Sequence, residues 1–316
     1  MPAFTHRDLD AAKGRGKVVC VMDASTYVGL WIVQGLLNRG YTVHATIQNG
    51  GEFESLKKLS GERLKILYAD MLDYHSIVDA LSGCSGLFYT FDSPQYDEEI
   101  AEIEVRAAHN VLEACAHTET IEKVIFTSSV AAVVWREDRN SICDLHERHW
   151  SDVNLCRKLK LWYALGKTLS ERTAWALAMD RGVNMVTINT GLVVGPGSAY
   201  KTSGSTIAYL KGAAQMFENG LLASVDVRFV AEAHICAFEE ASAYGRYICF
   251  NQMVNNAQNA DKLAESLRSL VPFPDRCEDT SVYQQRLSNK KLTELMLEAD
   301  IERQVPIANE AFQKLM

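Results

Sequence analysis

Short, continuously apolar runs alternate with longer segments of helical periodicity from residue 17 to residue 190. The short runs are rich in β-branched and aromatic residues, which predicts strands. The longer segments repeat apolar residues at the spacing of one helix face, which predicts helices. We expect strands at 17–22, 41–47, 64–70, 86–91, 123–129 and 184–190, and helices at about 28–39, 52–59, 74–82, 97–117 and 158–181.

This alternation determines the expected fold class. Strands that are apolar throughout are buried on both faces, which is typical of a parallel sheet covered by helices on each side. Because strand–helix–strand crossovers are right-handed, the fold class is α/β, a doubly wound parallel Rossmann sheet. Ligands of such sheets bind at the carboxyl ends of the strands.

The expected domain boundaries follow from where the alternation begins and ends. Residues 1–16 form an N-terminal tail, 17–190 a Rossmann domain of the dinucleotide-binding type, and 191–316 mainly a smaller C-terminal α/β substrate lobe. Segments near 226–237 and 245–251 are expected to return to the Rossmann sheet. The further helices expected in the lobe lie near 258–270, 288–299 and 306–315.

Composition and charge exclude several classes of function. The net charge is −8, so the chain lacks the basic surface typical of proteins that bind nucleic acid or anionic membranes. No apolar run approaches the ~18 residues that a membrane helix needs, and the N-terminal segment has no apolar signal core. The eight cysteines have no paired spacing and are expected to be reduced. We therefore expect a cytoplasmic protein with a small-molecule ligand.

One cluster has metal-ligand spacing. Cys143, His146 and His149 follow the pattern C-x2-H-x2-H, which could hold zinc. A fourth ligand is missing nearby in the sequence, and the surrounding letters, ICDLHERHWSD, are typical of a surface loop. We expect no metal site here.

The first predicted strand runs into a turn and a helix in the stretch VCVMDASTYVGLW, residues 19–31. Dinucleotide-binding proteins place glycines at this junction, because the tight turn and the pyrophosphate need bare backbone. Here the three positions hold Asp23, Thr26 and Gly29. A carboxylate there would repel phosphate, since two unit charges about 4 Å apart cost ~4 kcal/mol at an effective dielectric of 20. In the alternative interpretation, Asp23, Ser25 or Thr26 caps the helix in place of a phosphate.

The strongest chemical signal is WYALGK, which places Tyr163 and Lys167 on one face of a helix, one turn apart. A free tyrosine has a pKa of about 10, and a neighbouring ammonium would lower it. Such a pair can donate a proton to a developing alkoxide. Upstream, Ser128 and Ser129 end a predicted strand, where a hydroxyl can hold a carbonyl oxygen. The structural alternative is a strand-ending turn at the serines and a packed helix face at the tyrosine and lysine.

Several longer motifs resemble one family. They are RGYTVHAT, ADMLDY, VIFTSSVAAV, HWSDVNLC, WYALGKTLSE, VTINTGLVVGPG, VDVRFVAEAHICA and LSNKKLTEL. Together they resemble the extended short-chain dehydrogenase/reductases, specifically the plant cinnamoyl-CoA reductase and dihydroflavonol reductase group. The resemblance implies reduction of a phenylpropanoid-type carbonyl or CoA thioester with NADPH. It also implies that Ser129 is the catalytic serine, Tyr163 the acid, Lys167 its partner and a cofactor contact, and Asp70 an adenine contact.

The cofactor-binding positions depart from the pattern of this family. The family's T-G-A-S-G-[FY]-[IL]-G is MDASTYVG here. The second strand ends at Gln48, where related NADPH enzymes carry an arginine for the 2′-phosphate. After the fourth strand, Phe91 and Asp92 are added beside the cofactor channel. The cofactor-binding residues implied by the resemblance are Asp23, Ser25, Thr26, Tyr27, Gly29, Gln48, Asp70 and Lys167.

Two functional hypotheses follow. In the first, the chain is an NADP(H)-dependent reductase that uses Ser129, Tyr163 and Lys167 and whose cofactor binding is impaired. In the second, it is a catalytically inactive pseudoenzyme of the same fold that has lost NADP(H) and binds a small phenolic ligand or a protein partner. The intact Ser–Tyr–Lys set favours the first hypothesis, and the departures in the cofactor cradle favour the second.

Overall fold

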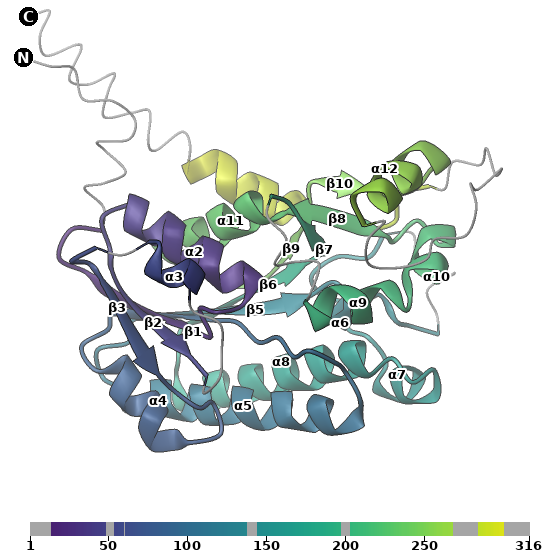
Figure 1. Cartoon of the computed structure of the whole chain (residues 1–316). Helices are drawn as coiled ribbons and strands as arrows, with labels where there is room; N and C mark the ends of the chain where they lie inside the picture. The colour runs from purple at the N-terminus through teal and green to yellow at the C-terminus, as the bar shows by residue number, and fades with distance from the viewer. Residues whose placement is uncertain are drawn as a thin grey trace, which may run out of the picture.

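Seven parallel strands form the central sheet of the computed structural model, in the order β3-β2-β1-β4-β5-β6-β9 (Figure 1). The structure describes residues 14–48, 54–59, 61–137, 144–196, 203–267 and 284–299. The strands are β1 (Val18–Met22), β2 (Thr42–Ile47), β3 (Leu64–Tyr68), β4 (Gly86–Tyr89), β5 (Lys123–Ser129), β6 (Met185–Thr190) and β9 (Gly245–Cys249). The expected doubly wound parallel Rossmann sheet is confirmed.

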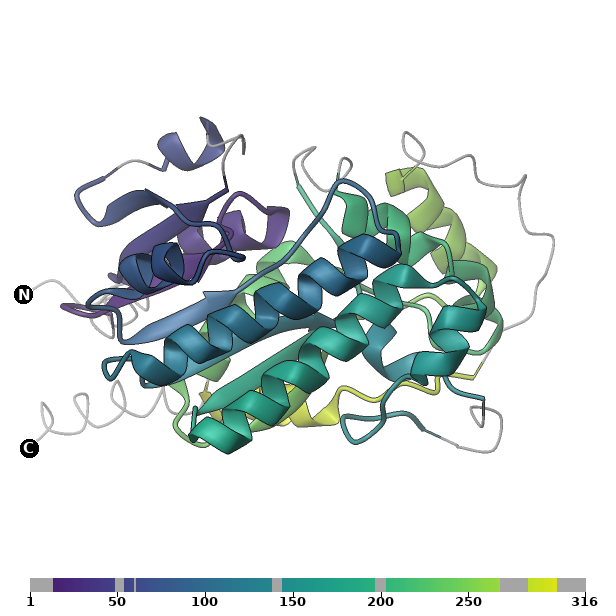
Figure 2. The same ribbon diagram turned by 90° about the horizontal axis from the view of Figure 1, so that it is seen from below.

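Helices cover both faces of this sheet, and strand pleating explains why. In β1, Val19 and Val21 belong to one apolar cluster, whereas Cys20 and Met22 belong to the other. The first cluster packs under α2 (Tyr27–Asn38) and α11 (Val227–Glu239), and the second under α4 (Tyr74–Leu81), α5 (Glu98–His117) and α8 (Trp162–Arg181) (Figures 1 and 2). The inner strands are therefore buried on both sides, as their continuous apolar letters predict, whereas the edge strand β3 is only partly covered and Tyr68 is 61% exposed.

The smaller lobe contains a second sheet of three strands. They are β7 (Leu192–Val194), β8 (Ala223–Asp226) and β10 (Gln252–Met253), in the order β10-β8-β7. This lobe lies beyond the carboxyl ends of the central strands (Figure 1). The remaining helices are α3 (Glu54–Lys57), α6 (Ala131–Val134), α7 (Val153–Lys158), α9 (Gly204–Leu210), α10 (Ala213–Glu218), α12 (Ala257–Leu267) and one over residues 290–299.

Two expected elements differ from the structure. The segment 245–251 returns to the sheet as β9, but 226–237 returns as helix α11 on the face of the sheet and adds no strand. The helix expected over 158–181 begins later, at Trp162, because Lys160 adopts a left-handed φ of +53° and separates it from the short helix α7. The helix expected at 306–315 lies outside the described residues.

The topology creates a crevice between β1 and β4. From β1 the chain adds β2 and β3 on one side, and it then crosses back to place β4 on the other side of β1. The connections that leave β1 and β4 therefore run in opposite directions and leave a crevice between them. Asp23 follows β1, Thr90 follows β4, and Ser129 and Thr190 end β5 and β6. No helix in the described part of the chain is long and apolar enough to cross a membrane.

Candidate active site at the carboxyl ends of the strands

Asp23 stands at the turn between β1 and α2 in a left-handed conformation, with φ of +57°. Its carboxylate is buried and accepts two hydrogen bonds, from Ser25 Oγ at 2.5 Å and from Gln48 Nε2 at 3.0 Å. Its backbone N–H donates to Thr46 Oγ1 at 2.9 Å. The side chain is therefore directed toward the end of β2, the part of a Rossmann sheet where the adenosine ribose of a dinucleotide binds.

Thr26 is the N-cap of α2. Its Oγ1 accepts the backbone N–H of Gly29 at 3.0 Å and lies 2.9 Å from the carbonyl oxygen of Asp23 and 3.0 Å from Thr90 Oγ1. The cap interpretation of the sequence is confirmed for this residue. Gly29 occupies the third glycine position of the motif. Only glycine fits there without a shift of the backbone, because an added Cβ would lie 2.5 Å from the Asp23 carbonyl oxygen. A protein hydroxyl thus takes an N–H group that Rossmann folds usually present to a phosphate.

The other expected cofactor contacts are spread around this turn. The hydroxyl of Tyr27 donates to the carbonyl oxygen of Pro196 at 3.0 Å, which ties α2 to the smaller lobe. Asp70 follows β3, is exposed and accepts the backbone N–H of Leu72 at 2.8 Å. A contact of Asp70 with adenine remains a prediction.

The pKa of the Asp23 carboxyl is raised from 3.8 to about 6: burial is the largest cause and the nearby charge of Asp92 adds to it, while hydrogen bonds from Ser25 and Gln48 oppose the rise. The folded protein thus binds this proton more tightly than the unfolded chain, so stability falls as the pH rises from about 4 through about 6. Above that range the ionised carboxylate costs up to about 3 kcal/mol, because each pKa unit corresponds to about 1.4 kcal/mol.

Substitution Asp23→Asn is therefore expected to raise the free energy of unfolding by about 1–3 kcal/mol at about pH 7.5. Asparagine tolerates the left-handed conformation and removes the charge. The gain should shrink as the pH falls toward about 4, where the wild-type carboxyl is protonated. Urea unfolding of both proteins across this range measures it, and a difference that does not change with pH would contradict a buried, ionised Asp23.

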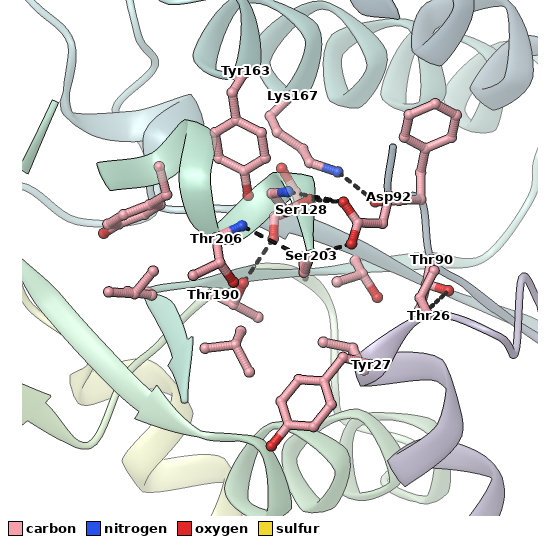
Figure 3. A pocket seen from close by; sticks show the side chains of 18 residues that line it. Thr26, Tyr27, Thr90, Asp92, Ser128, Tyr163, Lys167, Thr190, Ser203 and Thr206 are labelled. Carbon is pink, nitrogen blue, oxygen red and sulfur yellow. Dashed lines mark hydrogen bonds between the residues drawn. The ribbon is translucent and has the colours of Figure 1, made fainter. Parts of the chain in front are cut away.

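Tyr163 and Lys167 lie one turn apart on α8, and both side chains point into the same cavity (Figure 3). The Tyr163 ring packs edge-to-face against the rings of Tyr96 and Tyr209, with centroids 5.0 and 6.3 Å apart. Ser129, at the end of β5, lies close enough to lower the pKa of the Tyr163 phenol, while its own hydroxyl donates to the Thr190 carbonyl oxygen at 3.4 Å and accepts the Ala131 N–H at 3.1 Å. The structure thus brings together the three residues for which the sequence predicts a catalytic role, although the role itself remains a prediction.

The cation expected beside Tyr163 has another partner. Lys167 Nζ forms a buried ion pair with Glu104 Oε1 of α5 at 2.8 Å and donates to the carbonyl oxygen of Phe91 at 3.1 Å. Burial raises the pKa of Tyr163 above its ordinary value, the charges of Glu104 and Asp92 raise it further, and hydrogen bonds with Ser129 and Ser205 lower it. The lowered tyrosine pKa expected from the sequence is therefore wrong in direction.

Ser128 serves a buried charge network. Its hydroxyl donates to Glu171 Oε2 at 2.7 Å, and the same oxygen accepts Asn189 Nδ2 at 2.8 Å. Arg246 Nε pairs with Glu171 Oε1 at 2.6 Å. Ser128 is thus part of this network, whereas the strand-ending turn expected as the structural alternative occurs at Ser129, whose hydroxyl accepts the backbone N–H of Ala131 at 3.1 Å.

The cavity lined by Tyr163, Lys167 and Asp92 is small, about 60 Å³. Asp92, after β4, partly closes it by accepting hydrogen bonds from Ser203 Oγ and Ser205 Oγ, both at 2.6 Å, and from the Ser205 backbone N–H at 2.9 Å (Figure 3). The start of α9 lies so close to the loop after β4 that a Cβ at Gly204 would be 1.8 Å from the Ser93 carbonyl oxygen. The smaller lobe is thus fastened across the crevice by the protein's own side chains.

Glu104 is the site residue that the sequence analysis missed. A signal was present, because Glu104 lies at helical spacing from Ala101, Ala108 and Val111, all of which are buried. A carboxylate on an apolar helix face needs a buried partner. In this structure the partner is Lys167.

Of the cluster with metal-ligand spacing, the structure describes the two histidines. Cys143 lies outside the described residues, whereas the rings of His146 and His149 pack edge-to-face with centroids 4.3 Å apart. Within the described ranges, no group of three His, Cys, Asp or Glu side chains could hold a metal ion.

Comparison with known proteins shows extensive similarity to reductases. The chain matches the 3-beta hydroxysteroid dehydrogenase/isomerase family over residues 20–246. It is 37% identical to cinnamoyl-CoA reductase 1 of Petunia hybrida over 295 residues, which cover 90% of this chain and 88% of that protein. It is 34% identical to tetraketide alpha-pyrone reductase 1 of Arabidopsis thaliana over 284 residues, which cover 85% and 86% of the two chains.

Solved structures agree. Vestitone reductase from alfalfa (Medicago sativa) superposes with a TM-score of 0.70 at 28% identity, over 88% of this chain and 91% of that one. Yeast methylglyoxal/isovaleraldehyde reductase Gre2, solved with NADPH, shares the fold at a TM-score of 0.69 and 20% identity, over 88% and 92%. By its motifs, fold and relatives, the chain belongs to the extended short-chain dehydrogenase/reductase family, in the group that resembles cinnamoyl-CoA and dihydroflavonol reductases.

Proposed function

We propose that the protein is a cinnamoyl-CoA-reductase-like reductase for a phenylpropanoid-type carbonyl or CoA thioester, and that it binds NADP(H) weakly. The family membership supports the reaction class. The observation that carries the weak binding is the buried carboxylate of Asp23, held by Ser25 and Gln48 at the adenosine end of the crevice. Those two side chains would otherwise be free to donate to a phosphate.

The residues around Asp23 do not fit an anionic group as they stand. A phosphate charge about 4 Å from the carboxylate is disfavoured by ~4 kcal/mol at an effective dielectric of 20, which is nearly three powers of ten in affinity. Thr26 adds to this effect, because its hydroxyl caps α2 and takes the Gly29 N–H that a phosphate could otherwise accept. The 2′-phosphate, which distinguishes NADPH from NADH, would lie at the adenosine ribose and therefore next to the Asp23 carboxylate.

For turnover, the chain's own residues would act on the substrate carbonyl. The hydroxyl of Ser129 would orient the carbonyl oxygen, and the phenol of Tyr163, still protonated at neutral pH, would donate its proton to that oxygen. The cavity would have to open at the Asp92–Ser203–Ser205 contact to admit a substrate.

A second candidate is a pseudoenzyme that binds a small phenolic ligand or a protein partner. The buried ion pair between Lys167 and Glu104 favours it, because Lys167 is then part of the helix packing between α5 and α8. The small volume of the cavity favours it as well. Either candidate predicts poor dinucleotide binding, and turnover separates them.

Titration of the wild-type protein with NADPH and with NADH, followed by calorimetry or nucleotide fluorescence, tests the proposal. We expect dissociation constants near the millimolar range, with NADPH the weaker ligand, because the carboxylate removes about three powers of ten from a micromolar affinity. Saturation by NADPH in the micromolar range would contradict weak binding. Reduction of a cinnamoyl-CoA or an aromatic aldehyde at saturating nucleotide would favour the reductase over the pseudoenzyme.

A further inference from the structure

Glu104 and Lys167 connect the two long helices on one face of the sheet, α5 and α8, which run side by side (Figure 2). Both side chains are almost fully buried, with 1% and 4% of their surface exposed. The ammonium also donates to the Phe91 carbonyl oxygen at 3.1 Å, and Ser170 Oγ lies 3.4 Å from the same carboxylate oxygen of Glu104. The ion pair is therefore an integral part of the α5–α8 interface and has little contact with solvent.

Small residues make room for the carboxylate. A Cβ added at Gly166 would lie 2.9 Å from Glu104 Oε2 and 3.2 Å from the Cα of Ala101, so glycine allows α8 to approach α5 at this level. Glu104 Oε2 is buried and has no hydrogen-bond partner among the described residues. The Lys167 ammonium is thus the principal group that compensates the charge of Glu104.

This pairing changes the charge near Tyr163. Lys167 Nζ lies 5.6 Å from the centroid of the Tyr163 ring and half that distance, 2.8 Å, from the carboxylate oxygen of Glu104. A cation this close to an anion acts on a third group as a weak dipole, so most of its attraction for a phenolate is lost. Asp92 contributes a further negative charge that Tyr163 experiences.

We propose that Glu104 is a positioning residue: its carboxylate retains the Lys167 ammonium in the α5–α8 interface and cancels the positive charge that would otherwise act on Tyr163. The proposal rests on the proposed function only in taking Tyr163 as the acid of the site. Without the carboxylate, Lys167 becomes an uncompensated cation one helical turn from Tyr163 and favours its phenolate.

The test measures the acidity of residue 163 directly and needs no cofactor. Tyr163 is replaced by a difluorotyrosine, whose more acidic phenol titrates while the protein is folded, and its ¹⁹F resonance is followed against pH. Glu104→Gln keeps the shape of the side chain and removes its charge. We expect the pKa of the fluorinated phenol to fall by at least about one unit, a tenfold increase in its acid dissociation constant. An unchanged pKa would overturn the proposal.

A matched control lies at the other end of the same two helices. Glu113 of α5 pairs with Arg181 of α8 at 2.9 Å, so Glu113→Gln removes the same charge from the same helix pair far from the cavity. It should leave the titration of residue 163 unchanged, and Glu104→Asp should restore the wild-type value. If Glu104→Gln does not fold, Glu104→Leu provides the same comparison with an apolar side chain. Micromolar binding of NADPH would overturn the proposed weak binding without affecting this result, so the two claims fail separately.

Discussion

Replacing Asp23 and Thr26 together by glycine is expected to increase the affinity for NADPH by about two to three powers of ten. The double substitution removes the carboxylate that occupies Ser25 and Gln48, and it frees the first turn of α2 for a phosphate. Glycine also suits the left-handed conformation at position 23. Calorimetric titration of wild-type and variant proteins with NADPH measures the change.

The matched control is Asp73→Gly. Asp73 caps α4, the helix after β3, by accepting the N–H of His75, so this variant removes one negative charge and one helix cap without altering the hydrogen bonds of Ser25, Thr26 or Gln48. We expect the control to change NADPH affinity by less than a factor of about three, because exposed charges are screened by solvent. Equal affinities for the wild-type protein and the Asp23→Gly, Thr26→Gly variant would refute the electrostatic account.

The substitution Lys167→Met is expected to lower the free energy of unfolding by about 3–5 kcal/mol, because it leaves the Glu104 carboxylate buried without its cation. Adding Glu104→Leu to it should recover most of the loss, since an apolar pair of similar volume needs no compensating charge. Urea unfolding of the two single variants and the double variant gives the coupling energy between the residues.

Arg181→Met serves as the control for that measurement. Its partner Glu113 joins the same two helices, but the Arg181 side chain is 47% exposed, so the loss should stay within about 1 kcal/mol. Equal losses of stability in Lys167→Met and Arg181→Met would contradict a stabilising role of the buried pair. A further loss when Glu104→Leu is added to Lys167→Met would contradict it as well.

The fold could be predicted because it depends on local patterns. Continuous apolar runs such as Val18–Met22 are too short for helices and favour strands buried on both faces, and the helical segments between them favour parallel pairing. The lobe was harder to predict, because its elements are short and depend on contacts between distant segments. The apolar letters of 226–237 fit a strand and a buried helix equally well, and packing against α2 and the sheet selects the helix.

The sequence predicted those features of the site that depend on a single helix or strand, but not those that depend on contacts between elements. Helical spacing placed Tyr163 and Lys167 on one face. The net charge next to Tyr163, however, depends on Glu104, a counterion of Lys167 that comes from another helix. In the same way, the sequence marked Asp23 as a departure without showing where its carboxylate points. That direction depends on the left-handed turn and on Gln48, which β2 brings next to it.

The most direct test of this account is a crystal structure of the unmodified protein at neutral pH with NADP⁺ at about 0.1 mM, tenfold below the dissociation constant that we expect. We predict that the Asp23 carboxylate keeps its hydrogen bonds to Ser25 and Gln48 and that no nucleotide occupies the crevice between β1 and β4. A well-ordered NADP⁺ whose 2′-phosphate is bound by Ser25 and Gln48, with the Asp23 side chain rotated away, would contradict it.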